Sequence, residues 1–185
     1  MVIRVLSLFH SLLLCDNSSS LFFPPCHSDA LKKKFQWLGF HPVDILKDKT
    51  VQEMEKHLED LSKRVTGDCF VCCVLSHGNE TGVNGSDDKI LSIGDILSPF
   101  SGDRCQALAG KPKVFFIQAC RGLAMQDKVQ ADGDNSLDRI ISIPIYADFL
   151  LSMSTFEGFV SCRDPEQGTW FIQSLCRQLA ESCPK

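Results

Sequence analysis

Two stretches in the middle of the chain carry apolar residues without interruption, and each has the length of a strand. Residues 69–75 read CFVCCVL and residues 114–117 read VFFI. Continuous apolar runs, in contrast to alternating ones, are typical of strands buried on both faces of a parallel sheet. A third run, within residues 147–155, has the same character. These segments predict the centre of a sheet.

Other segments repeat their apolar residues at helical spacing. The helix expected over residues 51–65 has a clear start, because Thr50 and Glu53 have the types and spacing of a capping box. Residues 94–100 predict a short helix, and helices alternating with buried strands favour an α/β fold with a central, mainly parallel sheet. The periodic positions are Leu31, Phe35 and Leu38; Val51, Met54, Leu58, Leu61 and Val65; and Phe171, Leu175 and Leu179.

The first 28 residues fit this pattern poorly. They carry one arginine and then an apolar run interrupted by His10 and Ser11, which resembles a secretory signal but is too short to span a membrane. Residues 21–27 predict neither a helix nor a strand. We therefore expect residues 1–28 to lie outside the domain, as a weak signal or, preferably, as a mistaken start of the coding sequence.

A second break in the pattern covers residues 123–143. This segment is polar, lacks an apolar period, and predicts an exposed loop or linker. Four aspartates fall within it: Asp127, Asp132, Asp134 and Asp138.

Composition narrows the class of protein. The chain has 185 residues, 44% of them hydrophobic and 23% charged, which fits one globular domain. Its net charge is −4 and its longest basic cluster is residues 32–34, so nucleic-acid binding is disfavoured. Most of its ten cysteines lie in apolar runs, where cysteine acts as a small hydrophobe, and this favours a reduced, intracellular protein over a secreted, disulfide-bonded one.

Reactive side chains follow two of the predicted strands. His77 comes after the first buried strand and Cys120 after the second. Ligands bind at the carboxyl ends of strands in open α/β sheets, so both residues are expected at one edge. A thiol beside an imidazole is activated as a nucleophile. Gly78 and Gly122 permit close backbone approach, and the amides of Gly78 and Cys120 are candidates for an oxyanion hole.

Two other interpretations compete with this one. Taken singly, a histidine after a strand is most often a loop residue and a cysteine most often inert core, so the physical pattern alone leaves the question open. Cys69, Cys72 and His77 also have zinc-like spacing. Residues i and i+3 of a strand face opposite sides, however, so Cys69 and Cys72 cannot share an ion, and a metal site is disfavoured.

Residues 118–122 read QACRG, a signature already known for the caspases, with a histidine some fifty residues upstream. SHG at residues 76–78 matches the same family. So do DALKKKFQWLGF, LAGKPKVFFIQACRG, IPIYADFLLSMST and SCRDPEQGTWFIQSLC, in the family's order over about residues 29–183. The chain thus resembles the caspases, a family of clan CD cysteine peptidases, and most closely its death-receptor initiators of the eight and ten types.

The resemblance implies a three-layer sandwich and a cysteine endopeptidase of apoptosis that cleaves after aspartate. Cys120 is then the nucleophile and His77 the acid/base, with the oxyanion hole formed as above. Gln118 and Arg163 match two parts of the aspartate pocket. The resemblance implies no cofactor and no metal.

The resemblance also implies a processing pattern and partners. Residues 29–122 correspond to a large subunit, 123–143 to the linker and 144–185 to part of a small subunit. Asp132 is the first candidate for self-processing and Asp138 the second. Expected partners are protein substrates with an aspartate before the scissile bond, a second copy of the chain, and other caspases or adaptors; the expected location is the cytoplasm, without membrane or nucleic-acid contact.

The chain departs from the family pattern at both ends. An RGT-like stretch, whose arginine lines the aspartate pocket, is absent before residue 29, and the family's later small-subunit strands, including the dimer strand, do not follow residue 185. We expect a sheet that is incomplete at both edges. The alternative function is therefore a catalytically impaired decoy or regulatory binding protein.

Overall fold

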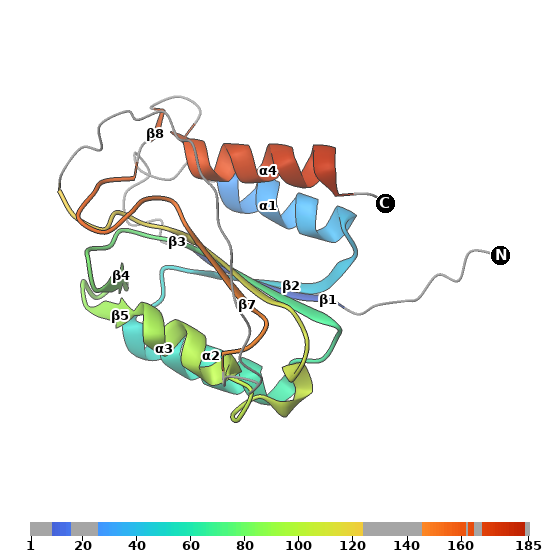
Figure 1. The fold of residues 1–185 in the computed structure, drawn as a ribbon. Helices are drawn as coiled ribbons and strands as arrows, with labels where there is room; N and C mark the ends of the chain where they lie inside the picture. The colour runs from blue at the N-terminus through green and yellow to red at the C-terminus, as the bar shows by residue number, and fades with distance from the viewer. Residues whose placement is uncertain (1–8, 16–25, 124–145, 162, 165–167, 184–185) are drawn as a thin grey trace, which may run out of the picture.

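Five parallel strands form a central sheet with helices on both faces (Figure 1). The computed structural model describes residues 9–15, 26–123, 146–161, 163–164 and 168–183. The strand order is β2-β1-β3-β6-β7, and every neighbouring pair is parallel. The predicted α/β fold is confirmed. The strands are β1 (Phe9–Cys15), β2 (Phe40–Lys47), β3 (Cys69–Leu75), β6 (Lys113–Gln118) and β7 (Phe149–Met153).

The helices form an outer layer on each face of the sheet. In Figure 1, α1 and α4 lie together above the sheet, and α2 and α3 lie below it. The helices are α1 (Cys26–Trp37), α2 (Val51–Arg64), α3 (Ile93–Leu97) and α4 (Trp170–Ser182), with 3-10 turns η1 (Ser98–Phe100) and η2 (Gln106–Leu108). Two small antiparallel ladders complete the fold: β4 (Gly82–Asn84) with β5 (Ile90–Ser92), and β8 (Arg163–Asp164) with β9 (Gly168–Thr169).

The alternation of side chains along β3 divides the core into two clusters. Phe70, Cys72 and Val74 pack with residues of α2 and α3. Val71 and Cys73 face the other way and pack with residues of α1 and α4. A strand buried on both faces must be apolar at every position, which explains the unbroken run in the sequence.

Lys113 anchors the amino end of β6 and is itself buried. Its ammonium donates to the carbonyls of Leu108 at 2.9 Å and Lys111 at 2.8 Å, and it lies 5.1 Å from the centre of the Phe149 ring. Burial lowers the pKa of Lys113. The bonds tie the turn before β6 to the strand, so the strand that leads to Cys120 is fixed at its start.

The prediction that no strand precedes the first helix is wrong. β1 lies second in the sheet, between β2 and β3, and pairs with β3 along its full length. The run that resembles a secretory signal is also an apolar segment of strand length, and the two neighbouring strands satisfy its backbone. Helix α1 also starts earlier than expected, at Cys26. The sheet therefore does have a strand in the place where we expected it to be incomplete.

Strand β2 was not predicted from the sequence. It lies at the edge of the sheet, and most of its residues are exposed or only partly buried. Pro42 interrupts the strand pattern, yet an edge position tolerates proline because its missing N–H has no neighbour to bond. Among the described helices, none combines the length and the apolar character that crossing a membrane requires.

The capping box of α2 provides a direct test of the fold. The Thr50 side chain accepts from the Glu53 amide at 3.3 Å, and the Glu53 carboxylate accepts from the Thr50 amide at 2.9 Å. Removing the hydroxyl by Thr50→Ala is expected to lower the free energy of unfolding by about 1 kcal/mol, measured by urea denaturation. Gln52→Ala, an exposed change in the same helix, is the control. Equal stability of the two variants would contradict a contribution from the cap.

Candidate active site

Two neighbouring strands end at the same edge of the sheet and carry the candidate chemistry. The last paired residues of β3 and β6 are Leu75 and Gln118. The Ser76 amide then donates to the Gln118 carbonyl at 3.0 Å. His77 and Cys120 each follow two residues beyond the last pair. The two strand tips therefore lie side by side, as the strand order predicts.

Gly78 brings the two tips into backbone contact. A Cβ placed on Gly78 would lie 3.0 Å from the carbonyl oxygen of Cys120 and 3.1 Å from the Cβ of Ala119. It would also lie 2.5 Å from the carbonyl oxygen of Gly82, a contact shorter than those that Cβ atoms make in proteins. A side chain at position 78 would push the loops apart, so glycine is required for this close approach.

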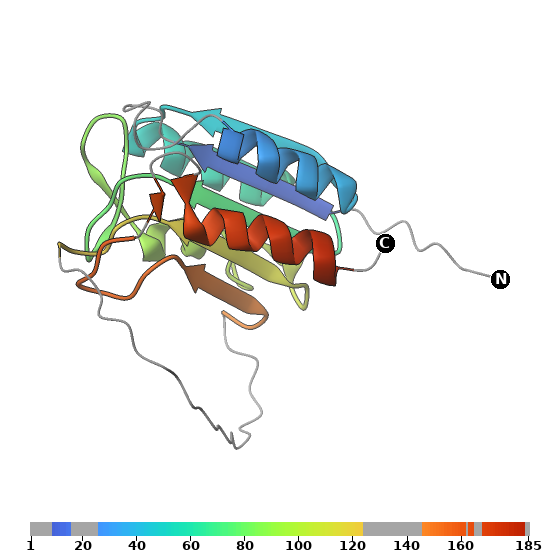
Figure 2. The ribbon, with the colours of Figure 1, turned by 90° about the horizontal axis from the view of Figure 1, so that it is seen from above.

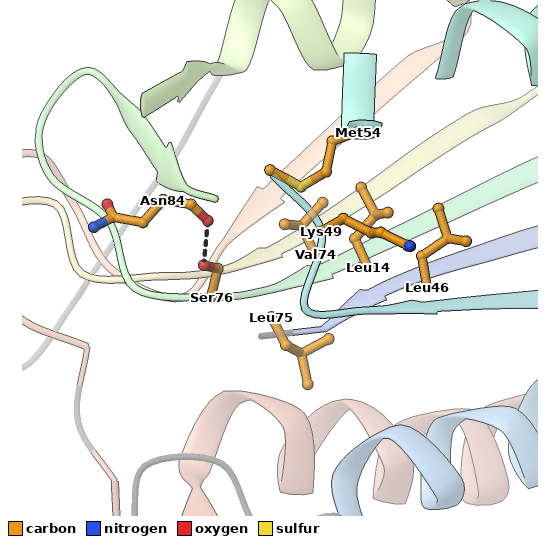
Figure 3. Close-up of a pocket in the computed structure, with 8 residues that line it drawn as sticks. All are labelled: Leu14, Leu46, Lys49, Met54, Val74, Leu75, Ser76 and Asn84. Carbon is orange, nitrogen blue, oxygen red and sulfur yellow. Dashed lines mark hydrogen bonds between the residues drawn. The ribbon is translucent and has the colours of Figure 1, made fainter. Parts of the chain in front are cut away.

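The loop that follows β3 is held by a short ladder. Gly78 forms an isolated antiparallel bridge with Val83, and the Asn84 amide donates to the His77 carbonyl at 2.8 Å. Figure 3 shows the Ser76 hydroxyl donating to the Asn84 carbonyl, at 2.8 Å. The backbone on both sides of His77 is thus held by hydrogen bonds, which restricts where its imidazole can lie.

An open cleft lies against these loops, with a volume of about 460 Å³. It runs between the loop after β3 and the loop after β6, so it adjoins Cys120 through Gly78. Such a volume is within the usual range for a ligand site. The cleft is lined by Gly78, Asn79, Glu80, Thr81, Gly122 and Leu123.

A second hollow, drawn in Figure 3, lies at the carboxyl ends of β1, β2 and β3. Its volume is about 10 Å³, which leaves room for roughly one water molecule. Apolar side chains of Leu14, Leu46 and Val74 form much of its wall. It is a packing defect beside the core and not the site of the chemistry.

The thiol of Cys120 is half-buried and oriented by a neighbouring loop. The Ser161 amide donates to its Sγ at 3.4 Å. The Ser161 hydroxyl in turn accepts from the Gln118 side-chain amide at 2.6 Å. One serine therefore connects the candidate nucleophile to the candidate substrate-binding residue two positions before it.

Gln118 is buried but not fully hydrogen-bonded. Its residue exposure is 2%, and its Oε1 has no hydrogen-bond partner among the described residues. Its Nε2 carries two hydrogens, of which the bond to Ser161 uses one. A buried acceptor without a partner costs about 1–3 kcal/mol, so Gln118 is a candidate for contact with a bound molecule beside Cys120.

Of the remaining predicted site residues, the structure describes the backbone of Arg163 but not the two candidate processing sites. The backbone of Arg163 begins β8 and pairs with Thr169, just before α4. Asp132 and Asp138 lie outside the described residues.

The zinc alternative fails on strand geometry. Cys72 packs in the cluster with α2 and α3, whereas Cys69 packs against the cluster with α1 and α4. Burial raises the pKa of both thiols, so each resists the deprotonation that metal binding requires. None of the seven cysteines whose side chains are described forms a disulfide: Cys69, Cys72, Cys73, Cys105, Cys120, Cys176 and Cys183.

The loop after β7 was not recognised as part of the site from the sequence. The Ser154 hydroxyl donates to the Ala119 carbonyl at 3.2 Å and accepts from the Ala119 amide at 3.3 Å. Ser161 adds its contact with Cys120. Serines are common in loops, so no local signal distinguishes these two. Only the position of β7 beside β6 in the sheet makes them part of the site.

These observations describe an α/β domain that carries a cysteine and a histidine at adjacent strand tips. Comparison with known proteins makes the assignment specific. The family model described as "Caspase domain" matches residues 24–185. The chain belongs to the caspase family.

Individual relatives agree with this assignment. The chain is 44% identical to mouse caspase-8 and 43% identical to human caspase-10, over 86% of its own length in each case. It spans about a third of the length of these relatives, 36% and 32% respectively. A crystal structure of caspase-1 from Spodoptera frugiperda superposes with a TM-score of 0.77 at 32% identity, covering 93% of this chain and 68% of that one.

The accessibility of the cysteines predicts an order of alkylation. Cys120 is half-buried in the loop, whereas Cys72 is fully buried and its pKa is raised. Limited treatment of the folded protein with iodoacetamide at pH 7.5, followed by peptide mass spectrometry, is expected to modify Cys120 well before Cys72 and Cys105. Unfolding in urea is the control and should equalise the rates. Equal rates in the folded protein would contradict an accessible nucleophile at the strand tip.

Proposed function

We propose that this chain is a cysteine endopeptidase that cleaves protein substrates after aspartate, in apoptosis and proteolytic signalling. The observation that carries the proposal is the backbone contact between Gly78 and Cys120 in a member of the caspase family. This contact supports a site in which His77, Cys120 and the amides that would bind an oxyanion act together beside the cleft.

The reaction would proceed by acyl transfer. His77 takes the proton of the Cys120 thiol, and the thiolate attacks the carbonyl carbon of the scissile bond. The amides of Gly78 and Cys120 stabilise the negative oxygen of the tetrahedral intermediate, each contributing about 2.7–4 kcal/mol. The intermediate collapses as the peptide C–N bond breaks, and the leaving amine takes its proton from His77. Water then hydrolyses the thioester and frees Cys120.

Gln118 and Arg163 would recognise the substrate aspartate. A carboxylate accepts hydrogen bonds only, so it can bond the free N–H of the Gln118 amide and the guanidinium of Arg163. The Gln118 Oε1, which has no partner among the described residues, would then accept from a cationic donor in the pocket.

Regulation and partners follow the family pattern in this proposal. Cleavage after Asp132, or second after Asp138, would separate a large-subunit part from a small-subunit part. Pairing with a second copy of the chain, association with other caspases or adaptors, and a cytoplasmic location belong to the same proposal. None of the seven cysteines whose side chains are described forms a disulfide, which supports a reducing compartment.

The role of Cys120 is tested by turnover of a fluorogenic tetrapeptide that ends in aspartate. We expect cleavage by the unmodified chain and its complete loss in Cys120→Ala, because the thiolate is the nucleophile. Cys183→Ala, which removes a thiol at the end of α4, is the matched control and should keep full activity. No turnover by the unmodified chain, even at high protein concentration, would instead favour the decoy function.

The role of Gln118 is tested by measuring kcat/KM for the same aspartate peptide. Gln118→Leu keeps the approximate size of the side chain but removes its N–H groups, so kcat/KM for the aspartate peptide is expected to fall at least about tenfold. Gln118 also bonds Ser161, whose amide contacts the Cys120 thiol, so the alkylation rate of Cys120 is measured on the same variant. We expect alkylation to slow much less than kcat/KM falls, which assigns the remaining loss to substrate binding. An unchanged kcat/KM would remove Gln118 from the aspartate pocket.

A further inference from the structure

Arg121 follows the candidate nucleophile and has no role in the proposed reaction. Its guanidinium Nη2 donates to the carbonyl of Glu80 at 3.3 Å and to the carboxylate of Glu157 at 3.4 Å. Its backbone amide donates to the Phe159 carbonyl at 2.9 Å, and its carbonyl accepts from the Gly158 amide at 2.7 Å. One residue is therefore bonded through both its side chain and its main chain.

Arg121 and its partners belong to three different loops at the carboxyl edge of the sheet. Glu80 lies in the loop after β3, Arg121 in the loop after β6, and Glu157 in the loop after β7. In Figure 2 the ends of these strands lie next to one another on the same side of the molecule. A single guanidinium thus bridges the loop that carries the candidate acid/base, the loop that carries the candidate nucleophile and the loop that orients its thiol.

The loops after β6 and β7 are also in direct backbone contact. Gly122 has φ +154°, and a Cβ on it would lie 2.2 Å from the carbonyl atoms of Gly158. No side chain fits between them. A shift of residues 156–161 would therefore move Gly122 and its neighbour Cys120 as well.

The Arg121 side chain is more shielded from water than that of Arg104, a second arginine that pairs with a glutamate. The exposed fraction of the Arg121 side chain is 18%, and that of its partner Glu157 is 62%. Arg104 pairs with Glu59 at 2.8 Å, but the two side chains are 46% and 39% exposed. Arg104 lies before β6 and Glu59 lies in α2, so this pair joins elements away from the strand tips. It provides a natural control for the loss of an ion pair as such.

We propose that Arg121 is a positioning residue, anchored by Glu157, that holds the three loops in register and so fixes Cys120 between Gly78 and the Ser161 amide. Glu80 and Gly122 both line the cleft, one from the loop after β3 and the other from the loop after β6, so the same bonds also hold the two sides of the cleft together. The inference deepens the proposed function, but it concerns the placement of the thiol and is measurable without turnover.

The effect is expected in the chemical step more than in substrate binding. Arg121→Met keeps the bulk of the side chain and the main-chain bonds but removes the guanidinium, so kcat is expected to fall about tenfold while KM changes little. Glu157→Gln, at an exposed position that does not threaten folding, should lower kcat about threefold. The double variant should be no slower than Arg121→Met alone, because the two residues act as one unit.

Alkylation of Cys120 by iodoacetamide gives a second readout that needs no peptidase activity. We expect its rate to fall about threefold in Arg121→Met as the thiol loses its orientation, and to recover partly in Arg121→Lys, which keeps the charge. Arg104→Met should leave both kcat and the alkylation rate unchanged, even if its melting temperature falls as far as that of Arg121→Met.

The outcomes separate the two proposals. Slower alkylation in Arg121→Met, in a chain that shows no turnover, supports the positioning role and removes the peptidase function. Equal effects of Arg121→Met and Arg104→Met would overturn the positioning role, since a loss of stability would then explain both. So would an additive double variant, because Arg121 and Glu157 would then act separately.

Discussion

The parallel pairing of β3 with β6 is the constraint on which the rest of the site depends. Parallel neighbours in register end at the same edge, so the pairing of Leu75 with Gln118 determines that His77 and Cys120 emerge together although 43 positions separate them. Core packing on both faces of β3 fixes this register, because a slip of one residue would exchange its two apolar clusters. Burial of apolar side chains in the centre of the sheet therefore determines that His77 and Cys120 lie side by side at its edge.

The sequence predicted the elements whose structure is determined by patterns among residues close together in the chain. The buried strands, the capped helix α2 and the QACRG tip all carry patterns that arise within a few residues. Strand β2 lies at the edge, where burial on one side is weak and alternation is lost. Strand β1 was taken for something outside the domain, because its apolar run matches a signal as well as it matches a strand.

The residues of the candidate site also divide into those that the sequence predicts and those that it does not. His77, Cys120 and Gln118 stand at the ends of readable strands, so the sequence places them. Ser161 and Glu157 reach the site from a loop after β7, and their contribution depends on which strand β7 neighbours. Strand order in a sheet is set by contacts distant along the chain, so no local pattern could have assigned these two residues.

Strand β1 has a practical consequence for how the domain is prepared. In the described part of the sheet, β1 joins β2 to the other strands, and β1 is the strand that pairs with β3 on the side away from β6. A recombinant version begun at residue 24, where the match to the family model starts, would leave out this strand. It would present the open backbone edge of β3, the most buried strand of the fold, to solvent and to other copies of itself. The match to the family model and the central sheet thus begin at different residues, 24 and Phe9.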